Sequence, residues 1–290
     1  MDLATFLIQC LNAVQYGLLL FLVASGLTLI FGIMGVVNLA HGSFYMLGAY
    51  LAYTLAAQMG SLPLAIVVGA LIAGVLGFVL ERLLFRHFYH RDHLDQVLLT
   101  FGFIYVFSDL THMIWGTDIL NVAVPSSLEG VLEIAGAIVP KYRLFIIAFG
   151  GLVAALLWWF LERSRVGAMV RAGVDDAATA AGIGINVPLL FGCIFALGAA
   201  LAAIGGIVAS PILGTYLGMD IEILIPAFIV VVIGGMGSLR GALVASLFVG
   251  LVDTFGKAYF PDFSLFVIYL LMVVVLLARP QGIFGIAKAA

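Results

Sequence analysis

The sequence predicts an all-α polytopic integral membrane protein of eight to ten transmembrane or re-entrant helices. Two observations carry this prediction: a scarcity of charge and a succession of long apolar runs. Of the 290 residues, 64% are hydrophobic and 9% are charged, and the mean hydropathy is +1.26. Soluble domains carry about 25% charged residues, because a surface facing water needs them. Most of the outer surface of this chain must therefore face lipid.

Nine apolar runs supply the expected spans. A helix needs roughly 20 apolar residues to cross a hydrocarbon core of about 30 Å. Strand-like alternation is absent, so helices rather than a barrel must satisfy the backbone groups in lipid. The second and eighth runs are short and glycine-rich, which makes them candidates for broken or re-entrant helices. The runs are Phe6–Met34, Leu39–Ala57, Leu62–Leu80, Val97–Trp115, Leu144–Leu161, Leu189–Ala209, Ile223–Met236, Ala242–Phe255 and Leu265–Ala278.

The distribution of Lys and Arg predicts the orientation. With nine alternating crossings, Lys141, Arg143 and Lys257 fall on one side of the membrane and nine basic residues fall on the other. The side richer in Lys and Arg is normally cytoplasmic. We therefore expect the N-terminus outside and the C-terminus in the cytoplasm. The nine residues are Arg82, Arg86, Arg91, Arg163, Arg165, Arg171, Arg240, Arg279 and Lys288.

One polar segment, residues 162–188, interrupts the apolar runs. Val166, Met169 and Val170 recur at helical spacing, so a short helix with one apolar face is expected. Asp175 is expected to cap a second short helix over 176–181, with Gly182 as its stop. A pair of short helices at the membrane surface suits the docking of a soluble partner. An ordinary solvated connector is the alternative.

Small residues and polar residues inside the runs mark expected contacts. Small residues recur at every fourth position from Gly192, which predicts close helix packing. The string Phe31–Gly35 resembles Ile233–Gly237, which is a possible internal repeat. Polar residues within spans are candidates for a translocation pathway, since burying them without a purpose is costly. The candidates are Asn38 and His41 at an expected helix break, Asp109 with His112 within reach, and Gly235; Asp253 lies in a similar setting.

Several classes of function are not expected. The near-match to a phosphate loop at Gly250–Lys257 has five residues between its glycines instead of four, and Ala258 replaces the required Ser or Thr. The period-three histidines of residues 87–93 do not share one helix face, and no common catalytic string is present. We therefore expect no enzyme, cofactor or metal site, and a net charge of −3 gives no reason to expect nucleic acid. A secondary transporter or channel remains the alternative of another class.

Four motifs resemble one known family. The string DAATAAG at 176–182 is similar to the E-A-A-x-x-x-G loop of ABC-transporter permeases, with Asp for Glu. The strings GVVNLAHG at 35–42, GGMGS at 234–238 and RPQGIFG at 279–285 resemble those of the branched-chain amino acid permeases. General ABC permeases continue to a distant Ile-x-Leu-Pro, whereas Ile185–Pro188 follows at once here, which favours the branched-chain type. The chain looks most like the first of two permease subunits in a Leu/Ile/Val uptake system.

The resemblance implies a mechanism. Residues 1–290 would form one transmembrane permease domain with the ABC importer permease fold, and 162–188 would be its cytoplasmic coupling loop. A second homologous permease, two cytoplasmic ABC ATPases and a periplasmic binding protein would be its partners in a bacterial inner membrane. Relatives of this type handle branched-chain amino acids, urea, short amides or aromatic acids, and the binding protein selects among them. The residues implied in coupling are Arg165, Gly167, Arg171, Asp175, Asp176, Ala177, Ala178, Gly182 and Asn186.

Overall fold

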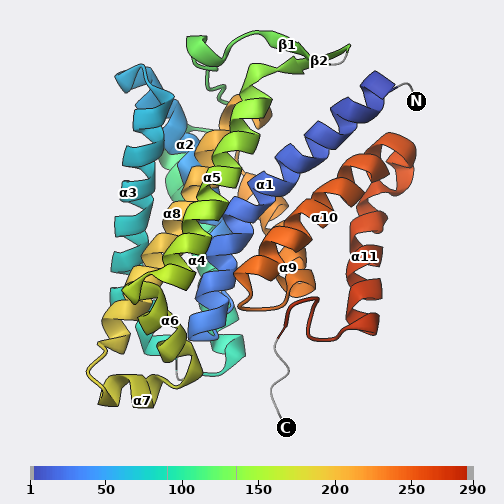
Figure 1. Cartoon of the computed structure of the whole chain (residues 1–290). Coiled ribbons are helices and arrows are strands. Elements are labelled where there is room, and N and C mark those ends of the chain that lie inside the picture. The colour runs from blue at the N-terminus through green and yellow to red at the C-terminus, as the bar shows by residue number, and fades with distance from the viewer. Residues whose placement is uncertain (1–2, 90, 135, 286–290) are drawn as a thin grey trace.

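The computed structural model describes residues 3–89, 91–134 and 136–285 (Figure 1). Nine long helices make up most of this described part of the chain. They are α1 (Leu3–Met34), α2 (His41–Met59), α3 (Leu62–Leu83), α4 (His93–Trp115), α5 (Lys141–Arg163), α8 (Val187–Leu213), α9 (Met219–Gly234), α10 (Leu239–Tyr259) and α11 (Ser264–Ala278).

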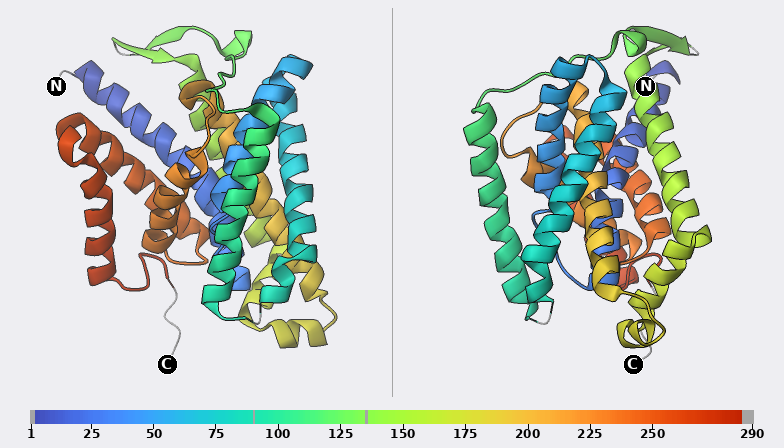
Figure 2. Two further views of the ribbon diagram at one scale, coloured as in Figure 1. Left: turned by 180° about the vertical axis from the view of Figure 1, so that it is seen from behind. Right: turned by 90° about the vertical axis from the view of Figure 1, so that its left-hand side faces the viewer.

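Short elements connect the long helices at two opposite ends of the bundle. At one end lies an antiparallel hairpin of β1 (Val131–Ile134) and β2 (Ala137–Pro140), in which Val131 pairs with Pro140 and Ile134 with Ala137. At the other end lie two short helices, α6 (Arg165–Asp175) and α7 (Ala177–Gly182) (Figures 1 and 2). We call these the hairpin end and the α6–α7 end. Three 3-10 turns complete the described part of the chain: η1 (Phe85–Phe88), η2 (Ser126–Leu128) and η3 (Pro261–Phe263).

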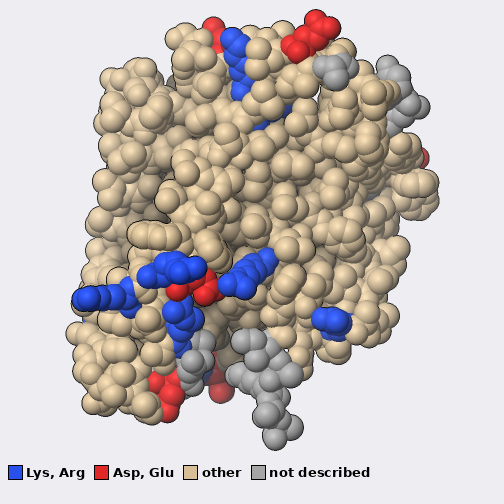
Figure 3. Space-filling view, in the orientation of Figure 1, with Lys and Arg blue, Asp and Glu red and all other residues tan. Residues whose placement is uncertain are grey.

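The helices have the length and composition of membrane spans. Within the described residues, six helices are long and apolar enough to cross a bilayer: α1, α3, α4, α5, α8 and α10; a shorter apolar stretch covers Phe266–Ala278. Each of the nine predicted runs corresponds to one long helix. In Figure 3 the middle of the visible face is almost free of Lys, Arg, Asp and Glu, which gather toward the two ends. The predicted class, an all-α polytopic membrane protein, is confirmed.

Helix α8 lies at the centre of the core because small residues let three neighbours approach it. A Cβ built on Gly26 of α1 would lie 2.6 Å from the carbonyl oxygen of Gly198. One built on Gly48 of α2 would lie 2.2 Å from that of Ala203. On the face toward α3, a Cβ on Gly77 would lie 2.7 Å from Cβ of Ala199. The close packing predicted from the small-residue stripe is therefore present in α8.

Two of the long helices begin inside the bundle rather than at an end. The Nε2 atom of His41, the first residue of α2, lies 3.0 Å from the carbonyl oxygen of Val23 in α1. Val23 precedes the end of α1 by 11 residues, or about 16 Å at 1.5 Å per residue. A Cβ on Gly42 would lie 2.2 Å from the carbonyl oxygen of Asp220, so α9 begins at the same depth. The N-termini of α2 and α9 therefore meet within the bundle.

Candidate functional site

The polar segment between α5 and α8 folds into two short helices that are fixed by caps. The hydroxyl of Ser164 accepts a hydrogen bond from the amide of Gly167 at 2.9 Å and begins α6. The carboxylate of Asp176 accepts from the amides of Ala178 at 2.9 Å and Thr179 at 3.0 Å and begins α7. The amide side chain of Asn186 accepts from Leu189 at 3.0 Å and begins α8. Each helix therefore starts at a side chain that satisfies one or two of its free amides.

The predicted cap of the second short helix was placed one residue too early. Helix α6 continues through Asp175, whereas Asp176 has the extended backbone of an N-cap, with φ −154° and ψ 100°. The hydroxyl and amide of Thr179, followed by the amide of Ala178, lower the pKa of Asp176. A lowered pKa means that this cap is formed at neutral pH and is lost only as the pH falls through that lowered value. The side chains of Asp175 and Ala177 lie outside the described part of the chain.

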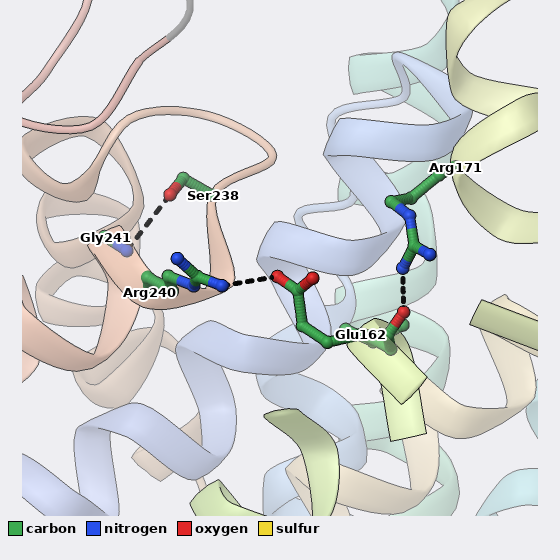
Figure 4. Close-up of polar contacts among 6 residues, drawn as sticks. Glu162, Arg171, Ser238, Arg240 and Gly241 are labelled. Carbon is green, nitrogen blue, oxygen red and sulfur yellow. Dashed lines mark hydrogen bonds and ion pairs between the residues drawn. The ribbon is translucent and has the colours of Figure 1, made fainter. Parts of the chain in front are cut away.

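The remaining residues predicted for coupling differ in their surroundings. A Cβ on Gly167 would lie 2.1 Å from the carbonyl oxygen of Leu161, so only glycine fits at this bend. The guanidinium of Arg171 donates to the same carbonyl oxygen (Figure 4). Arg165 is exposed, and Gly182 has open space around it at the end of α7. Of the apolar face predicted for α6, Val170 is buried, whereas Val166 and Met169 are exposed.

An ion pair connects this segment to the turn between α9 and α10. The Nη2 atom of Arg240 lies 2.9 Å from Oε1 of Glu162, the penultimate residue of α5 (Figure 4). Beside it the hydroxyl of Ser238 accepts from the amide of Gly241 and caps α10. The side chains of Arg240 and Glu162 are 64% and 41% exposed. The end of α5 is thus tied to the start of α10 by a contact that water can reach.

We expect this ion pair to contribute less than about 1 kcal/mol to stability, because exposed pairs gain little in water. Glu162→Arg and Arg240→Glu should each destabilise the purified chain slightly, and the double exchange should restore most of the loss. Thermal unfolding of the wild type, both single variants and the double variant gives the coupling energy as a double-mutant cycle. A coupling energy of zero would show that the two side chains act independently.

Glycines from three separate segments meet beside this turn. A Cβ on Gly32 of α1 would lie 2.4 Å from the Cα of Gly237, and one on Gly235 would lie 2.5 Å from the amide nitrogen of Gly285. The amide of Ile283 donates to the carbonyl of Ile233 at 2.8 Å, so the irregular segment after α11 runs along the end of α9. The motifs at 234–238 and 279–285 therefore meet at one junction, together with Gly32 near the end of α1. We call this the glycine junction: Gly32, Gly234, Gly235, Gly237, Gly241, Gly282 and Gly285.

A buried polar cluster surrounds the meeting point of α2 and α9. Asn38 and His41 are fully buried, and neither the amide group of Asn38 nor Nδ1 of His41 has a hydrogen-bond partner. The hydroxyl of Ser43 donates to Oδ2 of Asp220 at 3.1 Å. Asp220 lies in the first turn of α9. Its carboxyl group also faces the start of α2 through Ser43, so it lies near the free backbone amides of two helix N-termini.

Comparison with known proteins decides the family. The family model described as "Branched-chain amino acid transport system / permease component" matches residues 9–276. The chain belongs to this family. It is 32% identical to the high-affinity branched-chain amino acid transport system permease protein BraD of Pseudomonas aeruginosa, over 97% of this chain and 96% of BraD. It is 29% identical to LivH of Escherichia coli over the same shares, and 26% to the probable LivH of Methanocaldococcus jannaschii over 95% and 91%.

A solved structure shares the fold of this permease. The protein titled "PsaBC from Streptococcus pneumoniae in complex with Fab" superposes with a TM-score of 0.51 at 14% identity. The superposition covers 94% of the permease and 92% of the other chain. At this identity the similarity shows the fold alone. The branched-chain permease family predicted from the four motifs is thus confirmed, and the chain is a membrane transport protein.

The permease brings together only two of the four residues predicted for its pathway. Asn38 and His41 lie within one turn, where the amide of His41 donates to the carbonyl of Asn38 at 3.3 Å. Asp109 is exposed on α4, and Gly235 belongs to the glycine junction at the α6–α7 end. Within the described residues no hydrogen bond joins Asp109 to His112. The pathway role of these residues stays a prediction.

The sequence reading missed two acidic residues of this permease. Asp220 and Glu222 precede the apolar run predicted from Ile223, so they were not among the candidates within the spans. The structure places them in the first turn of α9, and Glu222 precedes the end of that helix by about 18 Å. One signal was available in the sequence: Gly218, two residues before Asp220. In the structure Gly218 is the N-cap of α9, with a φ of +96°. A glycine followed by two acids and an apolar run is typical of a helix N-terminus.

Proposed function

We propose that this permease forms half of the translocation pathway of an ABC importer for branched-chain or related amino acids. The observation that carries the proposal is the pair α6–α7, a polar two-helix element inserted between the spanning helices α5 and α8. A carrier that works alone would not require such an element. Residues 162–188 would act as the coupling loop of one permease domain covering 1–290, and they would seat in a groove of the ATPase.

The charge distribution supports an orientation with the α6–α7 end in the cytoplasm. Nine basic residues were assigned to the cytoplasmic side from the sequence. Eight of them lie at the α6–α7 end, and Lys288 lies outside the described residues. Lys141 starts α5 at the hairpin end, and Lys257 lies in the last turn of α10. By the positive-inside rule, this distribution supports an N-terminus in the periplasm and a C-terminus in the cytoplasm of a bacterial inner membrane.

The peripheral helices support pairing with a second homologous permease. Only 22% of an 18-residue apolar stretch of α4 is buried within the chain. Large apolar side chains of α4 and α11 are exposed, including Tyr105 at 60% and Leu277 at 81%. Lipid or a second subunit must cover these faces. The complete importer would comprise this permease, a second permease, two cytoplasmic ABC ATPases and a periplasmic binding protein.

The named relatives support branched-chain amino acids as the substrate, because BraD and LivH are described as transporting them. Urea, short amides and aromatic acids are the other substrates that we consider. An amino acid zwitterion with an apolar side chain suits a pathway that is mostly apolar and carries few fixed charges. The present chain fits this description, since 9% of its residues are charged.

The experiment that tests the proposal is a mild-detergent pull-down of the tagged chain with identification of every co-purifying protein. We expect two ATPases and a second permease in fixed stoichiometry, and ATP hydrolysis that a loaded binding protein stimulates. Radiolabelled leucine uptake into proteoliposomes then tests the substrate. Recovery of the chain alone, folded and stable, would contradict the proposal and favour a secondary transporter or channel.

A further inference from the structure

We propose that Glu222 lines the translocation pathway and accepts the ammonium group of the passing amino acid. This inference rests on the proposed function and assigns one part of substrate recognition to one carboxylate. Glu222 is exposed on α9, although its position along the helix is well inside the bundle. In the bilayer interior an exposed carboxylate normally faces a cavity or a charged partner rather than lipid.

The depth of Glu222 follows from two helices. Its neighbour Asp220 touches Gly42 at the start of α2, and 17 residues, or about 25 Å, separate Gly42 from the end of α2. In the other direction about 18 Å of α9 separate Glu222 from Gly234, which belongs to the glycine junction. Neither end of the bundle is therefore close to this carboxylate.

The carboxylate is fixed in place and is still accessible. The hydroxyl of Tyr216 donates to Oε2 of Glu222 at 2.5 Å. Ile221 and Ile225 lie on one side of Glu222 along the adjoining surface of α9 and are 48% and 43% exposed. A fixed carboxylate beside exposed isoleucines matches the two parts of a branched aliphatic amino acid, its ammonium group and its side chain. The view from behind shows α9 on the same side of the molecule as the peripheral helix α4 (Figure 2, left).

A second observation at the same depth indicates a polar ligand or water. Asn38 and His41 carry unpartnered polar atoms, and both residues are fully buried where α2 meets the first turn of α9. Buried polar groups normally have partners, and ordered water often supplies them. The carboxyl group of Asp220 already bonds Ser43 and lies in the first turn of α9. Among the described residues, the carboxylate of Glu222 bonds only Tyr216, through one oxygen, and Glu222 is the acidic residue of this turn that is exposed at the surface of the chain.

The first test measures whether water reaches this position. In a full importer whose Cys10 and Cys193 are replaced by alanine, Glu222→Cys should react with a membrane-impermeant methanethiosulfonate carrying a trimethylammonium group. We expect a rate at least tenfold above that of Leu71→Cys, a matched control because Leu71 is 63% exposed midway along α3. Equal rates at the two positions would overturn the inference. The labelling rate is measured without any transported substrate. A negative result would therefore count against the position of Glu222 and not against the proposed function.

The second test measures the role of the charge. Glu222→Gln should lower maximal leucine uptake by about tenfold while the KM for the loaded binding protein stays unchanged, and Glu222→Asp should recover part of the uptake. The control is Asp262→Asn, an exposed acid of η3 at the hairpin end, which should transport normally. Wild-type uptake by Glu222→Gln would overturn the ammonium role. If that variant does not fold, the cysteine reaction still decides whether the position lines an aqueous path.

Discussion

Gly206→Leu should leave almost no folded permease in the membrane. A Cβ at this position would lie 1.9 Å from the carbonyl oxygen of Tyr45 and 3.0 Å from the amide nitrogen of Ala49. Both atoms belong to the backbone of α2, so a rotamer change cannot relieve the clash and the two helices would have to separate. Overpacking between two backbones is among the most destabilising single substitutions. We expect the free energy of unfolding to fall by at least about 4 kcal/mol.

Fluorescence-detected size-exclusion chromatography of a tagged chain measures this loss as disappearance of the monodisperse peak. Gly151→Leu is the matched control, because Gly151 is exposed on α5 and a Cβ there would meet nothing within 4 Å. Replacing a glycine inside a helix should change stability by no more than about 1 kcal/mol. A normal peak for Gly206→Leu would mean that α2 and α8 pack less closely than described.

Asp176→Lys should uncouple ATP hydrolysis from uptake while membrane insertion is retained. The substitution removes the acceptor for the amides of Ala178 and Thr179 and puts a positive charge at a positive helix end. Loss of an N-cap alone destabilises a helix by about 0.5–2 kcal/mol. A cost in this range lowers the population of the conformation proposed to dock on the ATPase by roughly tenfold. Uptake by reconstituted importer, together with the ATPase rate with and without loaded binding protein, measures the effect.

Two further variants separate the cap from a general effect of charge. Asp176→Asn keeps an acceptor oxygen and should retain most of the uptake. Asp92→Lys introduces the same charge at the N-cap of α4, where the side chain makes no capping bond, and should transport normally. Unchanged stimulated transport in Asp176→Lys would remove the coupling role proposed for α6–α7.

The fold was predictable because lipid imposes a simple rule on sequence. A span must be long, apolar and helical, so the nine runs correspond to nine helices. The same rule failed where a helix begins within the bundle. Burial by protein, rather than length, decides the position of Asp220, and its partner Ser43 is 177 residues away in sequence. A local pattern contains no information about such a partner.

The α6–α7 segment was predictable for a different reason. Its polarity contrasts with the spans on both sides, and its caps are local, so the helices at 165–175 and 177–182 were expected in outline. The assignment to Asp175 instead of Asp176 reflects two adjacent acids with equal capping ability. The ion pair between Glu162 and Arg240 was not predictable, because it depends on how α5 and α10 pack.

The meeting of α2 with α9 has a consequence for biogenesis. Ser43 leaves the ribosome 177 residues before its partner Asp220, and at 5–20 residues per second this interval lasts roughly 9–35 s. During that time the hydroxyl of Ser43 can bond only locally, as Ser25, Ser210 and Ser246 each donate to the carbonyl oxygen three residues earlier. The contact between α2 and α9 therefore forms only after about three quarters of the chain has been synthesised.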